Sequence, residues 1–167
     1  MAERQPSFNE RRAQRENVEA IFNDGPEYHE FFTKEWKRDE QAQRFAERMT
    51  RHLSPIRPGG EATKILDIAA GTGFFSSALA DRGYVVTATD LSEEHLKYLR
   101  QRDERVSCVL ADMNESFPFR DNSFGGIITV WGNRFLDEDK KPFLREVYRM
   151  LEPGGVLMWP YFPIEKP

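Results

Sequence analysis

The sequence predicts an α/β fold, in which a doubly wound, mostly parallel sheet of about five strands follows an N-terminal helical appendage. Three observations support this prediction. Short apolar runs alternate with amphipathic segments from Ile65 onward, a glycine-rich crossing joins the first run to its helix, and an acidic residue stands at the end of each of the first three runs. Alternation of this kind produces right-handed βαβ units with parallel strands. All strands should therefore end at one edge of the sheet.

The N-terminal third of the chain is predicted to be helical. One helix-like stretch covers about residues 9–22, a break follows at 24–26, and a second helical region covers 28–53. In the second region apolar residues recur at spacings of three and four, which is typical of an amphipathic helix. An aromatic cluster near its start would fasten this region to a core or close over a pocket; it comprises Tyr28, Phe31, Phe32 and Trp36.

We expect a single domain with two parts, because 167 residues are enough for one core. Residues 1–60 would form the helical appendage or lid, and residues 61–167 the core. After the first strand, the expected strands of the core are 84–89, 106–110, 126–130 and 156–159, and the expected helices are 74–82, 93–100 and 139–150.

Composition excludes several classes of partner. The net charge is −4 and no segment is strongly cationic, so a nucleic-acid partner is not expected. No apolar run approaches the roughly 18 residues needed to span a bilayer. The single cysteine, Cys108, cannot form an intramolecular disulfide. We therefore expect a cytoplasmic protein that acts on a small molecule.

The stretch 65–75 predicts a nucleotide-cofactor site. It passes from a strand through Asp67 and two glycines, Gly71 and Gly73, into a helix. A glycine-rich crossing lets backbone N–H groups at a helix N-terminus approach a ligand. Such turns are also common without any ligand, so this stretch is weak evidence by itself.

Three carboxylates at successive strand ends strengthen the prediction. Asp67, Asp90 and Asp112 each follow or close an apolar run, at separations of 23 and 22 residues. In a parallel sheet they would face one crevice at the carboxyl edge, where open α/β folds bind ligands. Asp90 could accept hydrogen bonds from both hydroxyls of a ribose, and Asp112 one from an exocyclic amine such as that of adenine. The predicted ligand is an adenosine derivative.

From Ile65 to Trp159, over about 95 of the 167 residues, the sequence resembles class I S-adenosylmethionine-dependent methyltransferases of the small-molecule type. The resemblance implies a Rossmann-like core, S-adenosyl-L-methionine as cofactor and a small-molecule methyl acceptor. Its motifs are Leu66-Asp67-Ile68-Ala69-Ala70-Gly71-Thr72-Gly73, Thr89-Asp90-Leu91-Ser92, Ala111-Asp112-Met113, Phe117-Pro118-Phe119 with Asn122-Ser123-Phe124, and 145–155.

The resemblance also implies which residues contact the cofactor. The glycines would flank the methionine part of the cofactor. The second motif would contact the ribose, and the third motif would contact the adenine. An aromatic residue after the fourth strand would line the pocket. The implied cofactor-binding residues are Asp67, Ala69, Gly71, Gly73, Asp90, Leu91, Asp112, Met113 and Trp131.

The sequence departs from the family at Ala69 and at its end. The family usually has glycine where Ala69 stands, and a methyl group there would narrow the approach of the cofactor. The family fold normally adds two strands after the fifth, whereas nothing follows Pro167 in this sequence. The fifth strand would then be an apolar sheet edge, and we expect either a truncated chain or an edge covered by another subunit, giving a homo-oligomer.

No catalytic residue is assigned, because methyl transfer from a sulfonium needs chiefly orientation of the acceptor and exclusion of water. His29 and Asp137 are the nearest candidates for a base, and the three histidines and one cysteine have no metal-ligand spacing. Two alternatives remain open. One is a non-catalytic module that keeps the cofactor fold for binding or protein interaction, and the other is a dinucleotide oxidoreductase.

Overall fold

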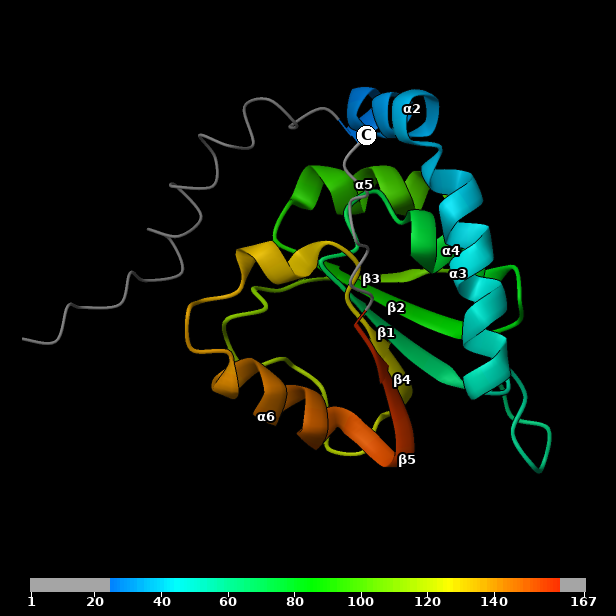
Figure 1. Ribbon diagram of the computed structural model, residues 1–167, viewed down its shortest axis with the longest axis vertical. Coiled ribbons are helices and arrows are strands. Elements are labelled where there is room, and N and C mark those ends of the chain that lie inside the picture. The colour runs from blue at the N-terminus through cyan, green and yellow to red at the C-terminus, as the bar shows by residue number, and fades with distance from the viewer. Residues whose placement is uncertain (1–24, 160–167) are drawn as a thin grey trace, which may run out of the picture.

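The computed structural model describes residues 25–159, apart from the side chains of Trp36, Asn133 and Arg134. Within this range the chain folds around a five-stranded sheet of order β3-β2-β1-β4-β5, in which every neighbouring pair is parallel. Helices cover both faces of the sheet (Figure 1). The predicted doubly wound, Rossmann-like α/β fold is confirmed. In chain order the elements are α2 (Gly25–Trp36), α3 (Arg38–His52), β1 (Lys64–Ile68), α4 (Phe74–Ala80), β2 (Val85–Asp90), α5 (Glu93–Arg102), β3 (Ser107–Leu110), β4 (Phe124–Ile128), the 3-10 turn η1 (Gly132–Phe135), α6 (Lys141–Met150) and β5 (Leu151–Met158).

Two hydrophobic clusters fill the two sides of the sheet. Ile65 and Ile128 belong to the cluster that also contains buried residues of α3, α4 and α5. Their neighbours Leu66 and Ile127 belong to the cluster that contains buried residues of α6. Successive strand residues point to opposite faces, so the continuous apolar runs of β1 and β4 are those of strands buried on both sides.

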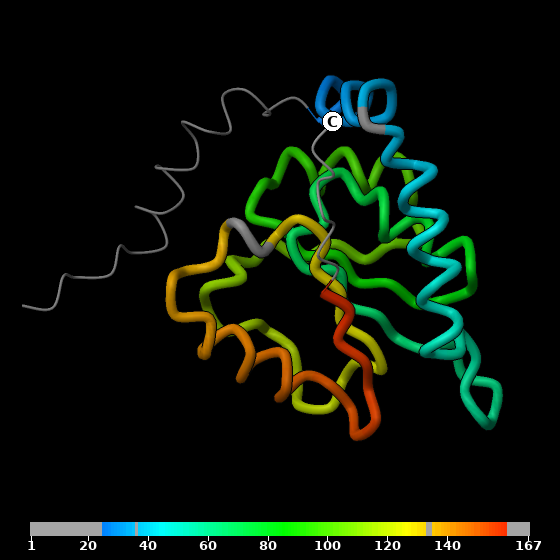
Figure 2. The backbone as a smooth tube through the Cα atoms, viewed as in Figure 1, coloured from blue at the N-terminus to red at the C-terminus, as the bar shows by residue number. Residues whose placement is uncertain are grey.

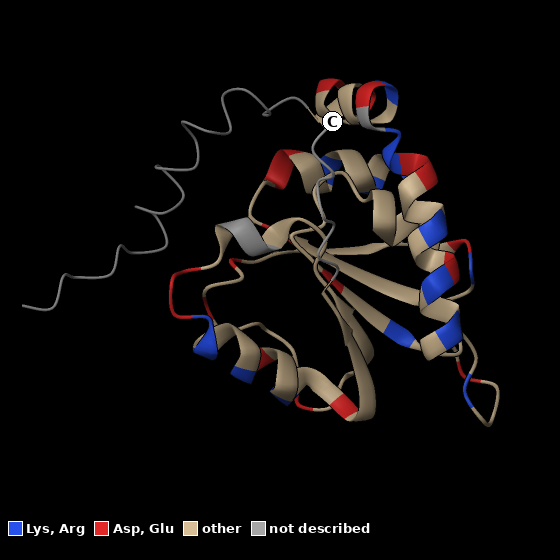
Figure 3. Cartoon of the chain, in the orientation of Figure 1, with Lys and Arg blue, Asp and Glu red and all other residues tan. Residues whose placement is uncertain are grey.

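The N-terminal helical region consists of two helices, not one. Lys37 has a left-handed backbone with φ of 47°, and it separates α2 from α3. The apolar face predicted for the second helical region is buried in α3, while most of the charged residues of this helix, coloured in Figure 3, are exposed. The helix predicted at 9–22 lies outside the described residues, and the division into 1–60 and 61–167 stays a prediction.

The last strand is longer than predicted, because it begins at Leu151 instead of residue 156. Leu151 pairs with Phe124, and the next pair is Gly126 with Val156, so the register shifts between them. The Pro153-Gly154-Gly155 segment therefore lies inside β5 as an irregularity, whereas the sequence predicted a strand that begins only after this segment. This strand forms one edge of the described sheet.

Shorter differences concern the element ends and the loop between α3 and β1. Helix α4 ends at Ala80, two residues before the predicted end, and α5 continues to Arg102, two residues beyond it. The loop after α3 extends away from the sheet (Figure 2), and its two sides are joined by a bridge between Ile56 and Ala62. Ser92 is the N-cap of α5, since its side chain accepts a hydrogen bond from the backbone N–H of His95.

Candidate active site

The turn between β1 and α4 brings the backbone to the carboxyl edge of the sheet. Ala69, Gly71 and Gly73 have positive φ angles of 58°, 57° and 79°. Glycine adopts this left-handed region freely, whereas for other residues it costs about 1–2 kcal/mol. A Cβ placed on Gly132, in the turn after β4, would come within 2.8 Å of the Ala69 Cβ. Ala69 is therefore a strained residue that narrows the space between these two turns.

Asp90 at the end of β2 holds the glycine turn in place. Its Oδ2 accepts a hydrogen bond from the backbone N–H of Gly71 at 2.7 Å, and its Oδ1 accepts one from the N–H of Ser92 at 2.9 Å. A carboxylate offers about four lone-pair sites, so these two bonds leave capacity for a ligand's hydroxyl groups. Asp90 thus connects the strand ends of β1 and β2 and faces the cavity between them.

Asp67, unlike Asp90, is fully buried, with 2% of its surface exposed. The hydroxyl of Ser76 donates to its Oδ2 at 2.6 Å. Burial raises the pKa of the Asp67 carboxyl to about 7, the Ser76 hydroxyl opposes this shift, and the nearby charge of Asp90 adds to it. At neutral pH the protonated and charged forms of Asp67 are therefore both populated.

A cavity of about 240 Å³ opens at this edge of the sheet, in contact with the ends of β1 to β4. Most of its wall is apolar, and the two carboxylates are set into it. The predicted site residues that line it are Asp67, Ala69, Gly71, Asp90, Leu91, Met113 and Trp131.

Gly73 and Asp112 are not among the described residues that line the cavity. A Cβ on Gly73 would come within 2.3 Å of the Leu99 side chain, so glycine is required here for the packing of α5 against the turn. Asp112 is buried, and its Oδ1 accepts hydrogen bonds from the backbone N–H and the side-chain amide of Asn114 at 2.9 and 3.2 Å. Contacts of either residue with a cofactor stay predictions.

The residues of the cavity wall that were not predicted as site residues include Tyr28, Arg38 and His95. The Tyr28 and His95 rings lie 4.6 Å apart between centroids, and Arg38 donates from Nη1 to the Tyr28 hydroxyl at 3.0 Å. Arg38 belongs to a run of four charged residues, 37–40, and no feature of the sequence marks it as different from the other three. His95 could have been predicted, because it lies in the first turn of α5, which begins at the same edge.

The two candidate bases do not line the cavity within the described part of the chain. His29 stacks on Phe74, with ring centroids 4.0 Å apart, and its Nδ1 is 3.1 Å from the Thr72 hydroxyl. Burial lowers the pKa of His29 to about 4, and the Arg102 charge contributes to this shift. The neutral imidazole therefore fastens α2 to the glycine turn. The backbone N–H of Asp137 donates to the Asn114 side chain.

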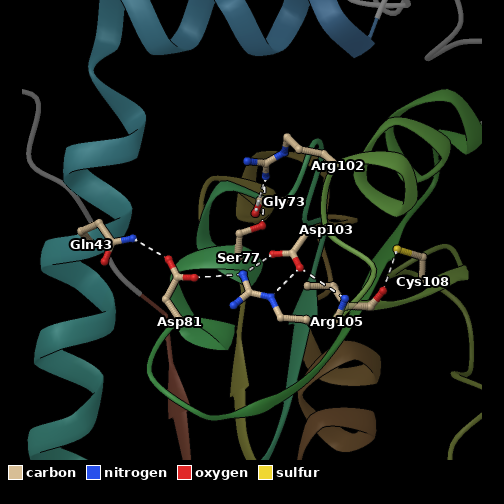
Figure 4. A network of polar contacts seen from close by, with 9 residues as sticks. Gln43, Gly73, Ser77, Asp81, Arg102, Asp103, Arg105 and Cys108 are labelled. Carbon is tan, nitrogen blue, oxygen red and sulfur yellow. Dashed lines mark hydrogen bonds and ion pairs between the residues drawn. The ribbon is translucent and has the colours of Figure 1, made fainter.

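Arg102 supports the glycine turn by donating hydrogen bonds to carbonyl groups of the turn. Its Nη2 lies 3.1 Å from the carbonyl oxygen of Thr72. The same nitrogen lies 3.2 Å from the carbonyl oxygen of Gly73 and 3.1 Å from the hydroxyl of Ser77 (Figure 4). Hydrogen bonds to consecutive carbonyl oxygens restrict how their peptide groups can rotate. Because each peptide group contains both a carbonyl and an N–H, these contacts from α5 also fix the orientation of the N–H groups of the turn.

A polar network continues from this point toward the N-terminal helices (Figure 4). Arg105 donates to both oxygens of Asp103 at 2.8 Å and to Oδ1 of Asp81 at 2.9 Å. The other oxygen of Asp81 accepts from the side-chain amide of Gln43 on α3 at 3.1 Å. The Arg105 guanidinium lowers the pKa of Asp103 to about 2, so this pair is charged over the whole physiological range.

Among residues 25–159 there is no group of His, Cys, Asp and Glu side chains arranged to hold a metal ion. In that same range, no helix combines the length and the apolar character that crossing a bilayer requires.

Comparison with known proteins gives a family match: residues 66–159 match the family described as "Methyltransferase domain". A demethylmenaquinone methyltransferase from Clavibacter sepedonicus is 44% identical over 109 residues, which cover 64% of this chain and 42% of that protein. The ubiquinone/menaquinone biosynthesis C-methyltransferase UbiE from Shewanella frigidimarina is 41% identical over 125 residues, covering 69% of this chain and 47% of that protein. The chain thus spans a little under half the length of these relatives.

Solved structures share the fold. Phosphoethanolamine N-methyltransferase 1 from Haemonchus contortus, in complex with phosphoethanolamine and S-adenosylhomocysteine, superimposes with a TM-score of 0.72 at 19% identity, covering 92% of this chain and 33% of that one. The glycopeptide N-methyltransferase MtfA, complexed with S-adenosyl-L-methionine, has a TM-score of 0.59 at 28% identity, covering 71% of this chain and 53% of that one.

Proposed function

Because the chain belongs to the methyltransferase domain family and has the fold of class I S-adenosylmethionine-dependent methyltransferases, we propose that it binds S-adenosyl-L-methionine and transfers the methyl group to a small organic molecule. The observation that carries this proposal is the cavity at the carboxyl edge of the sheet. There Asp90 fixes the glycine turn through Gly71, and Asp67 lies in the same wall.

The residues present fit such a cofactor. Asp90 retains acceptor capacity for two ribose hydroxyls, Met113 offers an apolar surface after β3 for the adenine, and Asp67 offers a carboxylate for the ammonium group of the amino-acid part. When bound, the cofactor supplies a methyl group on a positively charged sulfur. The protein then has to orient the acceptor and exclude water, and the mostly apolar wall serves both purposes.

We further propose that the methyl acceptor is a flat apolar ring compound of the quinone type. The names of the two bacterial relatives refer to the methylation of quinone precursors. In this chain Tyr28, Trp131 and Phe135 supply aromatic surface to the cavity. Aromatic rings favour offset or edge contacts with another ring, so this wall suits a planar substrate.

The similarity to methyltransferases favours catalysis over the two alternatives, a non-catalytic binding module and a dinucleotide oxidoreductase. A cytoplasmic location and the absence of a nucleic-acid partner remain part of the proposal, supported by the net charge of −4 and the single cysteine. Association of two chains through the β5 edge also remains a proposal.

The function is tested by titrating the purified chain with S-adenosylmethionine and S-adenosylhomocysteine in a calorimeter. We expect micromolar affinity for the wild type, and an affinity about 10- to 100-fold lower for Asp90→Asn, since the lost interactions are hydrogen bonds to a charged group. Asparagine keeps the shape of the side chain and one acceptor oxygen, so the fold should persist, which circular dichroism can verify.

The matched control is Glu104→Gln, which removes one exposed carboxylate outside the cavity. Its affinity should equal that of the wild type. Unchanged affinity in Asp90→Asn would refute the role of Asp90, and a folded wild-type chain that binds neither ligand would refute the proposed function.

A further inference from the structure

Arg38, at the first position of α3, places a positive charge at the cavity. Its Cζ is 3.7 Å from the centroid of the Phe32 ring, 5.8 Å from that of Trp131 and 6.0 Å from that of Phe74. Among the described residues that line the cavity, it is the one lysine or arginine. A guanidinium enclosed by aromatic rings is screened less by water, and it therefore attracts an opposite charge more strongly than an exposed one.

Tyr28 connects Arg38 with the glycine turn. The Tyr28 hydroxyl accepts a hydrogen bond from Arg38, and this hydroxyl and the ring edge lie 3.8 Å from where a Cβ on Gly71 would be. The backbone N–H of Gly71 in turn donates to Asp90. The side chains of the two N-terminal helices and the turn after β1 thus form one continuous wall.

The order of the strands places Arg38 at one end of the cavity. Asp90 ends β2 and Met113 follows β3, whereas the rings near Arg38 include Phe74, which follows β1, and Trp131, which follows β4. The sheet order is β3-β2-β1-β4, so the cavity runs from the β3 end to the β4 end. With the nucleoside at β2 and β3, as in the proposed function, the amino-acid part extends toward β1 and β4.

We propose that Arg38, assisted by the Tyr28 hydroxyl, binds the α-carboxylate of S-adenosylmethionine. The wall at this end would then match an amino-acid zwitterion, since the guanidinium faces the carboxylate and Asp67 is available to the ammonium group. The planar fork of N–H donors on arginine fits the two oxygens of a carboxylate better than a lysine does. The inference rests on the proposed function and makes α2 and α3 part of the cofactor site.

A purely structural role for Arg38 predicts a different result. If the side chain only fastened α2 to α3 by stacking on Phe32, its loss would weaken the binding of every cofactor analogue to the same extent. If it binds the carboxylate, its loss affects only ligands that carry one. The two roles are therefore separated by a pair of ligands that differ in this single group.

The experiment is a calorimetric titration with S-adenosylmethionine and with decarboxylated S-adenosylmethionine, which lacks the α-carboxylate. The wild type should prefer the former by about 10- to 100-fold, the range expected for a charge-assisted hydrogen bond. In Arg38→Met, which keeps an unbranched side chain over Phe32, affinity for S-adenosylmethionine should fall by the same factor. Affinity for the decarboxylated ligand should change less than about twofold, so the preference disappears.

The controls separate this inference from the proposed function. Arg44→Met, an exposed change on α3, should leave both affinities as in the wild type. Arg38→Lys should restore part of the preference, and it replaces Arg38→Met if that variant does not fold. Equal affinity of the wild type for both ligands, or the full wild-type preference retained in the Arg38 variants, overturns the inference alone. A wild-type chain that binds neither ligand overturns the proposed function, and the inference with it.

Discussion

At the residue scale, three aspartates that look equivalent in the sequence have three different environments. Asp90 is half-buried and accepts two backbone N–H groups, Asp67 is buried with the Ser76 hydroxyl, and Asp112 shapes the turn after β3 through Asn114. Their position at strand ends follows from the alternation of apolar runs. Their chemistry follows from burial and hydrogen bonding, which position along the chain does not reveal.

The environment of Asp67 predicts a pH-dependent stability. Its pKa rises on folding from the model-peptide value of 3.8 to about 7, so between these values the folded chain holds a proton that the unfolded chain has lost. The free energy of unfolding contributed by this group is fully present below pH 4 and is lost as pH rises through 7. Asp67→Asn has no such proton. We therefore expect the difference in unfolding free energy, variant minus wild type, to rise by on the order of 3 kcal/mol from pH 4 to pH 8.

This comparison is measured by urea unfolding of both proteins at intervals of one pH unit. His29, with a pKa lowered to about 4, has the opposite effect, because its neutral form stabilises the fold above pH 6.5 and that contribution is lost as pH falls. His29 is present in both proteins, so its contribution cancels in the difference. A difference in unfolding free energy that stays constant from pH 4 to 8 would show that burial does not raise the pKa of Asp67.

At the scale of elements, the glycine turn is held from both directions. On the cavity side, Asp90 binds the N–H of Gly71, and on the other side Arg102 binds the carbonyl oxygens of Thr72 and Gly73. These contacts come from β2 and α5, which follow the turn in the chain, while α2 adds His29 at Thr72. A short turn with three positive φ angles thus obtains its rigidity from its neighbours.

We expect Arg102→Gln to weaken the binding of S-adenosylmethionine by about 5- to 10-fold, since each lost hydrogen bond contributes roughly 0.5–1.5 kcal/mol. Arg102→Lys, which keeps a donor, should recover part of the affinity. The measurement is calorimetric titration combined with thermal unfolding. Arg100→Gln is the matched control, because Arg100 lies on the same helix and pairs with the exposed Glu93. A lower melting temperature with unchanged affinity would mean that Arg102 serves only stability.

At the scale of the whole molecule, β5 is an edge strand of the described sheet, with a neighbouring strand on one side only. In the described sheet it has β4 on one side, and its residues Val156, Leu157 and Met158 are half-buried. An edge strand presents unpaired backbone groups on its outer side, which can pair with another strand. More than half of the length of the two bacterial relatives lies outside the matched segment.

We expect the purified chain to associate through this edge into a homo-oligomer. Size-exclusion chromatography with light scattering gives the mass directly, and 19.5 kDa is the mass of one chain. An integer multiple of that mass that dissociates on dilution would support the prediction. A monodisperse monomer at all concentrations tested would refute it.

The sequence by itself determined the sheet and its carboxyl edge. Apolar runs, glycines and terminal carboxylates are local signals, and their spacing was sufficient to predict parallel strands and three of the lining residues, Asp67, Gly71 and Asp90. The family resemblance, and not the spacing, added Ala69, Leu91, Met113 and Trp131. Tertiary structure alone decided that Tyr28 and Arg38 belong to the same wall, and that Gly73 serves packing against Leu99. Contacts between residues far apart in the chain, such as Tyr28 with His95 or Arg38 with Trp131, depend on how α2, α3 and α5 pack on the sheet, and no local pattern encodes that packing.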